Sequence, residues 1–242
     1  QLPLAIFGIA LGIVLLPSLS KAIKSSNQEI IHNIQNRSIE FSLLISLPSA
    51  IGLYILAEPM IYILFERGAF LQQDTFYTAK VLGYFALGLP AYIIIKVLVA
   101  CFFAREDTKI PLYISIVSVI TNVVLSLLLI GSMREMGIAL ATAISAWVNA
   151  LLLYFFLAIR NHMKFDDLLL KNSIKILLSS SLLFVGVYLL NGLLFTNISK
   201  NSVLLNSIIL LLLIFLAITI YFGLVFMLKV LSTNQLKDYL KK

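Results

Sequence analysis

The sequence predicts an all-helical membrane protein that crosses a bilayer several times. Of its 242 residues, 61% are hydrophobic and only 12% are charged, and the mean hydropathy is +1.04. Soluble domains contain roughly 45 to 50% apolar residues, so we expect a bilayer to be the solvent for most of this chain. Apolar runs of about 20 residues, the length that crosses hydrocarbon as a helix, recur along the sequence.

We expect seven transmembrane helices, which cover residues 2–20, 39–57, 76–104, 110–131, 137–160, 172–194 and 203–230. The chain starts at Gln1 without a methionine or a charged leader, and its first span looks truncated. We therefore expect the chain to be the C-terminal part of a longer protein. Prolines such as Pro17 lie in or at the ends of the spans, where the missing N–H bends a helix.

Two connecting segments have a pattern of their own. Residues 22–38 place isoleucines against polar side chains at a roughly helical period, which predicts a helix lying on the cytoplasmic interface, with a plain polar linker as the alternative. Residues 58–66 are apolar but too short to cross hydrocarbon. We expect them to form a partly inserted or interfacial turn that begins at Glu58 and Pro59.

Basic residues are distributed unequally between the two ends of the predicted helices. If the helices alternate in direction, 13 of the 18 lysines and arginines fall at one end and four at the other, while Lys96 lies within a span. Cytoplasmic loops carry the excess of basic residues, so the first end, which includes the C-terminus, is predicted to be cytoplasmic. This topology accounts for the net charge of +7, and we expect no nucleic-acid partner.

The sequence offers little for catalysis. His32 and His162 fall in predicted loops without metal-ligand spacing, so we expect no metal centre. Asp166 and Asp167 are adjacent and do not share a helix face, so we interpret them as solvated charge balance. There is no phosphate-binding glycine loop, zinc motif or nucleophile elbow. We predict that the protein is not an enzyme.

Lys96 is the most informative polar residue because it lies within the predicted span 76–104. An ammonium group inside a bilayer costs several kcal/mol unless it faces water, a partner or an anionic ligand. The alternative is that the side chain reaches the interface, but Lys96 is far from the predicted helix end for a four-carbon stem. We therefore predict that Lys96 faces a cavity.

A second set of polar residues lies on the next two predicted spans. Asn122 and Ser126 are four residues apart on one helix face, and Thr142, Ser145 and Asn149 follow one side of the next helix. Facing each other, these side chains either hold a cation or hydrogen-bond between the helices, which is the commoner role of Ser, Thr and Asn in membranes. We expect no cofactor, with sodium as the alternative.

Four segments carry motifs that can be compared with known families. Residues 7–21 read FGIALGIVLLPSLSK, with Pro17 near their end. Residues 64–70 read LFERGAF, with Arg67 and Gly68 at the centre.

The other two segments follow in the same order. Residues 96–111 read KVLVACFFAREDTKIP and include Asp107 and Pro111, and residues 137–149 begin GIALAT and end at Asn149. Together, the four segments resemble the eighth transmembrane helix, the LFxxGxF loop, the KVLxxxFYxxxDxxxP segment and the region that follows in the MurJ (MviN) family. Its members flip lipid II, the lipid-linked peptidoglycan precursor. The resemblance covers essentially the whole chain.

The resemblance implies a MATE-like fold of the MOP superfamily, in which two six-helix lobes enclose a cavity and two extra C-terminal helices follow. Helices eight to fourteen would then lie in this chain. Residues 1–160 would form the second lobe, with its first helix truncated. Residues 161–242 would contain a cytoplasmic loop, the two extra helices, which are implied to guide the lipid tail, and a cytoplasmic tail.

The same resemblance implies a function and a location. The protein would flip lipid II across the bacterial cytoplasmic (inner) membrane by alternating access, for cell wall synthesis. Its partners would be lipid II, membrane lipids and the missing N-terminal lobe. Lys96 would face the cavity and the pyrophosphate of the substrate. Some members hold sodium, to which Asn122, Ser126 and Thr142 would contribute, although Ser126 replaces a better carboxylate ligand.

Two other functions are alternatives. One is a related MATE-like exporter of another lipid-linked saccharide or of drugs, which would have the same helix pattern and a different cavity. The other is a membrane glycosyltransferase, which would need acidic residues gathered at a membrane face. Glu58, Glu66 and Asp74 are instead scattered and fit no known motif.

Overall fold

A computed structural model describes residues 5, 9–195 and 202–230. This part of the chain forms eight helices, α1 (Ile9–Lys24), α2 (Gln28–Ile55), α3 (Ala57–Phe65), α4 (Gln72–Phe103), α5 (Lys109–Met133), α6 (Glu135–Ile159), α7 (Asp167–Leu194) and α8 (Val203–Met227). Six of them, all except α1 and α3, are long and apolar enough to cross a membrane. The predicted all-helical membrane fold is confirmed. Most of residues 2–8, where the first span was expected to begin, lie outside the described residues.

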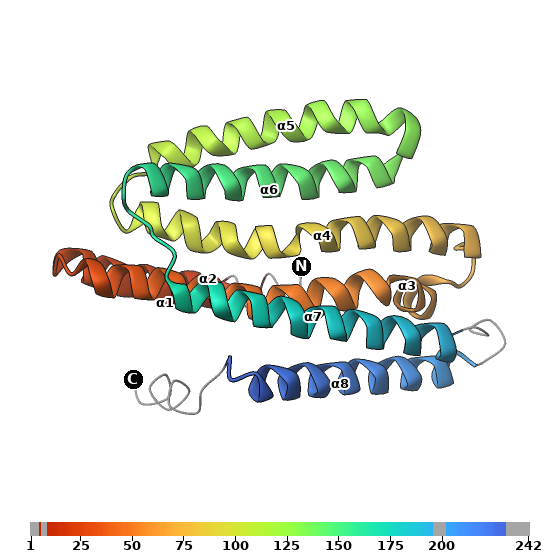
Figure 1. Cartoon of the computed structure of the whole chain (residues 1–242). Helices are drawn as coiled ribbons and strands as arrows, with labels where there is room; N and C mark the ends of the chain where they lie inside the picture. Colours follow the sequence, from red (N-terminus) through yellow and green to blue (C-terminus); the bar gives the residue numbers. More distant parts are fainter. Residues whose placement is uncertain (1–4, 6–8, 196–201, 231–242) are drawn as a thin grey trace.

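The long helices lie roughly alongside one another in a row. From one edge to the other, Figure 1 shows α5, α6, α4, α2, α7 and α8, and each helix contacts the next in this order. Helix α1 packs against α2 and α4, and the short α3 packs against α4 and α8. Helix α2 therefore joins the α4–α6 side of the molecule to the C-terminal pair, α7 and α8.

Two hydrophobic cores lie on either side of α2. The first is shared by α1, α2, α4 and the end of α6, and its members Leu19, Cys101 and Leu157 are fully buried. The second is shared by α2, α3, α7 and α8, where Ile176 and Val225 are fully buried. Both cores include residues of α2, so this helix is the structural centre of the described chain.

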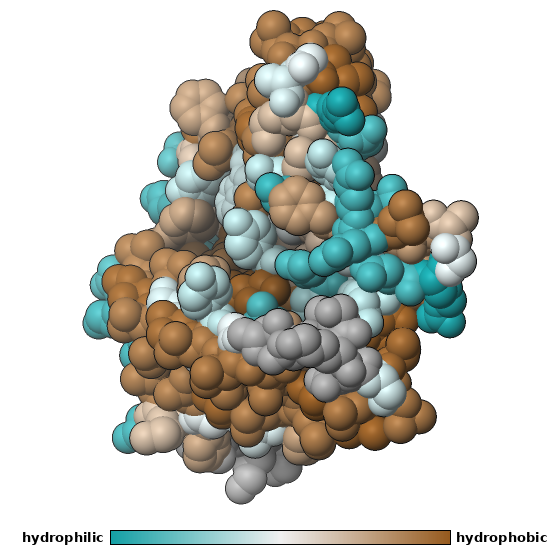
Figure 2. Space-filling model, turned by 90° about the vertical axis from the view of Figure 1, so that its right-hand side faces the viewer, coloured by the Kyte–Doolittle hydropathy of each residue, from teal (hydrophilic) through white to brown (hydrophobic). Residues whose placement is uncertain are grey.

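The outer faces of the row are apolar. On α5, for example, Leu127 and Leu128 are each 70% exposed. So much exposed apolar surface is unfavourable in water and suits contact with lipid. Figure 2 looks onto the end that carries α3 and the start of α4, and hydrophilic residues gather across this end while the sides are mostly hydrophobic. This distribution is expected of helices that cross a bilayer.

Residues 22–38 do not form a separate interfacial helix, so that prediction is wrong. Helix α1 continues to Lys24, and residues 28–38 are the first turns of the long helix α2. The Asn27 side chain starts α2 by accepting a hydrogen bond of 3.1 Å from the backbone N–H three residues later. Ile31 then packs into the first core, which holds these turns in line with the rest of the helix. Figure 1 shows the α1–α2 hairpin extending past the ends of the other helices.

The apolar segment after the second predicted span forms a short helix of nine residues, α3. Only Leu56 separates it from α2. Pro59 lies in its first turn, where proline removes no helical hydrogen bond. Its nine residues agree with the expected length, but the segment is a helix that begins at Ala57 rather than a turn that begins at Glu58. Its position at the membrane interface stays a prediction.

Candidate functional site

Lys96 lies on α4, seven residues before the helix ends at Phe103. At 1.5 Å per residue, this places it about 10 Å from the helix end. Its side chain is exposed, and within the described part of the chain no carboxylate pairs with it. The position within a span agrees with the sequence, and the role in a cavity stays a prediction.

Lys96 belongs to an uncovered stripe along α4. Phe85, Tyr92, Lys96 and Phe103 recur at intervals of seven, four and seven residues, which places them on one face of a helix. Phe85 and Phe103 are exposed and Tyr92 is only half-buried, whereas Val97 on another face is fully buried. The described helices therefore cover the face of α4 that carries Val97 and leave this stripe, with Lys96 as its one charge, uncovered. Nearer the start of α4, Leu87 on the opposite face is 44% exposed as well.

The polar residues expected on neighbouring spans do meet, between α5 and α6. Asn122 Nδ2 donates to Thr142 Oγ1 at 3.0 Å and to Ser145 Oγ at 3.2 Å. Ser126 Oγ donates to Asn122 Oδ1 at 3.4 Å, and Ser118 Oγ donates to the Ser145 carbonyl oxygen at 2.9 Å. We call these five residues the α5–α6 polar seam.

The polar side chains of the seam already form hydrogen bonds with one another and with the backbone of their own helix. The hydroxyls of Thr142 and Ser145 also donate to carbonyl oxygens of their own helix, at 2.9 and 3.0 Å. All its groups are neutral, and Asn149 on the same helix takes no part in these bonds. The arrangement is what interhelical hydrogen bonding requires, and sodium ligation stays the untested alternative.

The LFERGAF motif builds the turn between α3 and α4. Arg67 Nη2 donates to the carbonyl oxygens of Ile63 and Leu64 at 3.1 and 2.9 Å, which caps the C-terminus of α3. Gly68 adopts φ +64°, a left-handed conformation that favours glycine. Glu66 accepts a hydrogen bond of 2.5 Å from Thr75 on α4. The structure therefore gives Arg67 and Gly68 a structural role.

Asp107 and Pro111 organise the opposite end of α4. Asp107 Oδ1 accepts from the backbone N–H groups of Lys109 and Ile110 at 3.2 Å each, which caps α5, and Pro111 fits in the first turn that follows. Asp107 Oδ2 accepts a hydrogen bond of 2.8 Å from Arg160 at the end of α6. Pro17 lies inside α1, as the sequence suggested.

A buried ionic network links α2 to α7, and sequence reasoning missed it. Arg37 donates to both carboxylate oxygens of Asp166 at 2.8 and 2.7 Å and also pairs with Glu40. Glu40 Oε1 in turn accepts from Asn172 Nδ2 at 2.7 Å. The side chains of Arg37 and Glu40 are only 14% and 10% exposed.

Asp166 is therefore not the solvated charge that the sequence suggested. It also accepts from the backbone N–H of Leu169 at 2.6 Å and so caps α7. The burial of Arg37 and Glu40 requires a partner for each charge, and Asp166 supplies one. A signal was present in the sequence, because an arginine and a carboxylate three residues apart at the edge of an apolar run are costly unless they are paired.

His162 lies close to this network, in the connection between α6 and α7. Burial lowers its pKa, and the positive charges of Arg105 and Arg160 lower the pKa further, while Asp107 opposes them. Arg105 donates to the His162 carbonyl oxygen at 3.1 Å and so holds the connection against the end of α4. No group of three or more metal-ligating side chains occurs among the described residues.

The α7–α8 pair encloses a small apolar crevice. It has a volume of about 40 Å³ and is lined by aliphatic residues of both helices, among them Leu183, Val187, Leu213 and Leu216. On α7, Leu182 next to this crevice is 59% exposed. The surface expected to contact a lipid tail is therefore apolar, and the crevice that the described residues form on it is small.

These features define a multi-pass helical membrane protein in which Lys96 lies on an uncovered stripe of a spanning helix. The chain belongs to the MurJ family, because the family model described as lipid II flippase MurJ matches residues 1–211. The match includes the stripe of Lys96 and the α5–α6 polar seam.

Individual relatives agree with the family assignment. The probable lipid II flippase MurJ of Rhizobium tropici is 39% identical to this chain over 100% of its length. The corresponding protein of Rickettsia prowazekii is 37% identical over 97% of this chain. A third, from Rhizobium meliloti, is 41% identical over 78% of this chain. The chain spans 46%, 46% and 35% of the length of these three relatives, so it corresponds to less than half of each.

Proposed function

We propose that the intact protein flips lipid II across the bacterial cytoplasmic membrane for cell wall synthesis. The observation that supports this most is the combination of the family match with Lys96, the one charge on the uncovered stripe of α4. The relatives carry this function in their names. No covalent bond is made or broken in such a step.

The mechanism rests on shielding a charged headgroup. Moving the pyrophosphate of lipid II through hydrocarbon exposes charge at a cost of at least several kcal/mol. A second lobe, arranged as in MATE-like transporters, closes a cavity over the stripe of α4, and the cavity opens alternately to each side. The Lys96 ammonium faces the phosphate groups and offsets part of their desolvation.

The orientation follows from the basic residues. Arg37 near the start of α2, Arg105 just after α4 and Arg160 just after α6 lie at one end of the molecule. There they contact Asp166, His162 and Asp107, respectively. By the positive-inside rule this end is cytoplasmic, and so is the C-terminus. The lipid tail stays in the membrane against the apolar faces of α7 and α8.

The α5–α6 polar seam serves helix packing in this proposal, and no resident cofactor is needed. Exchange of sodium for potassium should leave the rate of flipping unchanged, both in the natural protein and in Asn122→Leu. A sodium requirement that disappears in Asn122→Leu, and remains in Asn149→Leu, would show that the seam is a coupling-ion site instead.

The function is tested by replacement in a bacterium whose own lipid II flippase is depleted. The intact protein should restore growth and the supply of lipid II to the outer leaflet. An exporter of drugs would reach the membrane, confer drug resistance and fail to restore growth. Rescue of another lipid-linked saccharide alone would favour the related exporter.

A further inference from the structure

A pocket of about 740 Å³ lies between the start of α2 and the connection that leads into α7. Glu29, His32 and Asn33 line it from the first turns of α2, and Lys164 and Asp166 line it from the connection. A volume of this size is within the range of small-ligand sites, roughly 300 to 1,000 Å³. None of these residues belongs to the stripe of Lys96 or to the α5–α6 polar seam.

The walls of the pocket are held in place by side-chain contacts. Asn36 Nδ2 donates to the Lys164 carbonyl oxygen at 2.9 Å, and Arg37 holds both oxygens of Asp166. The Phe165 ring stacks on Tyr154 of α6, with 4.5 Å between ring centroids and 10° between ring planes. The connection is therefore fixed to both α2 and α6, and the pocket is formed before any ligand arrives.

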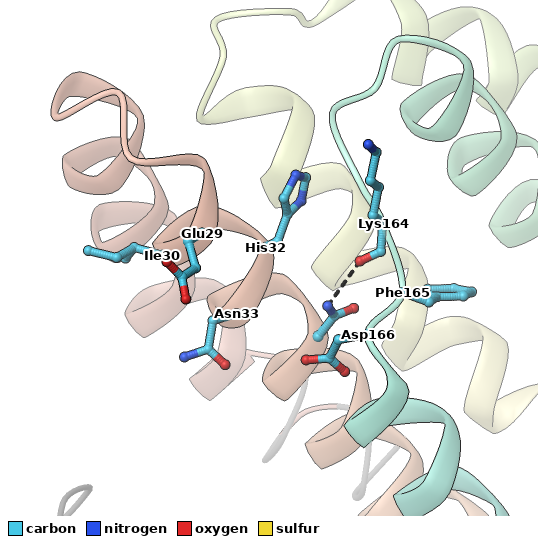
Figure 3. A pocket seen from close by; sticks show the side chains of 8 residues that line it. Glu29, Ile30, His32, Asn33, Lys164, Phe165 and Asp166 are labelled. Atoms are coloured by element: carbon cyan, nitrogen blue, oxygen red, sulfur yellow. Dashed lines mark hydrogen bonds between the residues drawn. The ribbon is translucent and has the colours of Figure 1, made fainter.

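Charges of opposite sign are separated within the pocket. Figure 3 shows the side chains of His32 and Lys164 extending toward the same end, while Glu29, Asn33 and Asp166 lie away from that end. Glu29 and Lys164 are exposed, and among the described residues neither forms an ion pair. A ligand with one negative and one positive group, a few ångströms apart, matches this arrangement better than a simple anion or cation.

The position of the pocket points to a lipid. The apolar run of α2 begins at about residue 39 and that of α7 at about residue 172, so the pocket lies just outside the hydrocarbon, where headgroups are found. Two large apolar side chains, Ile30 and Phe165, line the pocket and are 47% and 41% exposed. Exposed apolar side chains beside charged ones are typical of surfaces that lie at the membrane interface.

We propose that this pocket binds the phosphoethanolamine headgroup of a zwitterionic phospholipid of the cytoplasmic leaflet. The primary ammonium donates to Glu29 and Asn33, because Asp166 is already paired with Arg37. The phosphate accepts from the Lys164 ammonium and contacts His32. This is a separate site from the one proposed for lipid II, and it does not depend on that function.

The test is native mass spectrometry of the intact protein in detergent, titrated separately with phosphatidylethanolamine, phosphatidylcholine and phosphatidylglycerol of equal chain length. Phosphatidylcholine has the same charges but no N–H donor, and phosphatidylglycerol lacks the ammonium group. The proposal expects about fivefold tighter binding of phosphatidylethanolamine than of phosphatidylcholine. Glu29→Gln should remove this preference without weakening phosphatidylglycerol, and Lys164→Gln should weaken all three.

Matched controls come from the same end of the molecule. Glu106→Gln and Lys171→Gln replace exposed charges that do not line the pocket, and both should bind lipid as the natural protein does. Equal binding of phosphatidylethanolamine and phosphatidylcholine would overturn the proposal, and so would equal effects of Glu29→Gln and Glu106→Gln. Binding of free phosphoethanolamine in the absence of any preference among the lipids would overturn the assignment to a lipid.

Discussion

Arg37 is surrounded by polar groups from two helices and from the connection before α7. Replacement by methionine would leave Glu40 buried with only Asn172 as its partner. An unpaired buried charge costs about 3 kcal/mol or more, so Arg37→Met should lower the thermal unfolding temperature of the intact protein clearly. Circular dichroism in detergent measures this.

The control is Arg160→Met, which removes the more exposed pair with Asp107 and should cost less than about 1 kcal/mol. Adding Glu40→Gln to Arg37→Met should restore part of the lost stability, because a neutral amide needs no counter-charge. Equal losses in Arg37→Met and Arg160→Met would mean that the network of Arg37 is not buried in the way the structure shows.

His162 gives the stability a pH dependence with a definite sign. Its pKa in the folded protein lies below the ordinary value of 6.5, so between these two values the unfolded chain binds more protons. Stability contributed by neutral His162 is complete above pH 6.5 and decreases as the pH falls through this window. His162→Gln should therefore show a smaller loss of unfolding temperature between pH 7.5 and pH 5.5. An unchanged pH dependence would contradict this assignment.

At the scale of elements, the α5–α6 hairpin depends on a close approach at Gly137. A Cβ atom there would lie 2.8 Å from the backbone oxygen of Leu129, which is backbone and cannot move aside cheaply. Gly137→Ala should destabilise the protein by about 1 to 3 kcal/mol. Gly131→Ala is the control, because a Cβ at Gly131 meets nothing within 4 Å and alanine favours the helix. Equal unfolding temperatures for the two variants would contradict the close packing.

Hydropathy predicts the spanning helices well because each one must cross the hydrocarbon with its own residues. The predicted spans 110–131 and 137–160 agree closely with α5 (Lys109–Met133) and α6 (Glu135–Ile159). The start of α2 was missed because polar residues such as Gln35 are buried there against other helices rather than exposed to water. That burial depends on tertiary packing, which the local pattern does not contain.

Among the polar contacts, too, some can be predicted from local sequence and others depend on tertiary packing. Asn122 and Thr142 are 20 residues apart on consecutive helices, so helical spacing alone placed them together. Arg37 and Asp166 are 129 residues apart, and their contact exists only because α7 packs against α2. The pocket between the start of α2 and the connection before α7 results from the same packing, so no local sequence motif predicts it.

At the scale of the whole molecule, α2 connects the parts that the proposed mechanism must move. On one side, α4 carries Lys96 on its uncovered stripe, and on the other side α7 and α8 offer an apolar surface to a lipid tail. Contacts at the end of the molecule where α7 begins, through Arg37 and Asp166, keep the C-terminal pair attached to this core. In the proposed mechanism the chain would provide one wall of a cavity, and a second lobe would provide the other.

We propose that Lys96 contacts the phosphates of the substrate during flipping. The experiment that addresses this contact measures how much lipid II becomes accessible to an enzyme added outside spheroplasts that carry the intact protein as their sole flippase. Lys96→Met should reduce this accessibility at least about tenfold at equal protein levels, and Lys80→Met, at the other end of α4, should leave it unchanged. Normal accessibility of lipid II with Lys96→Met would contradict the account.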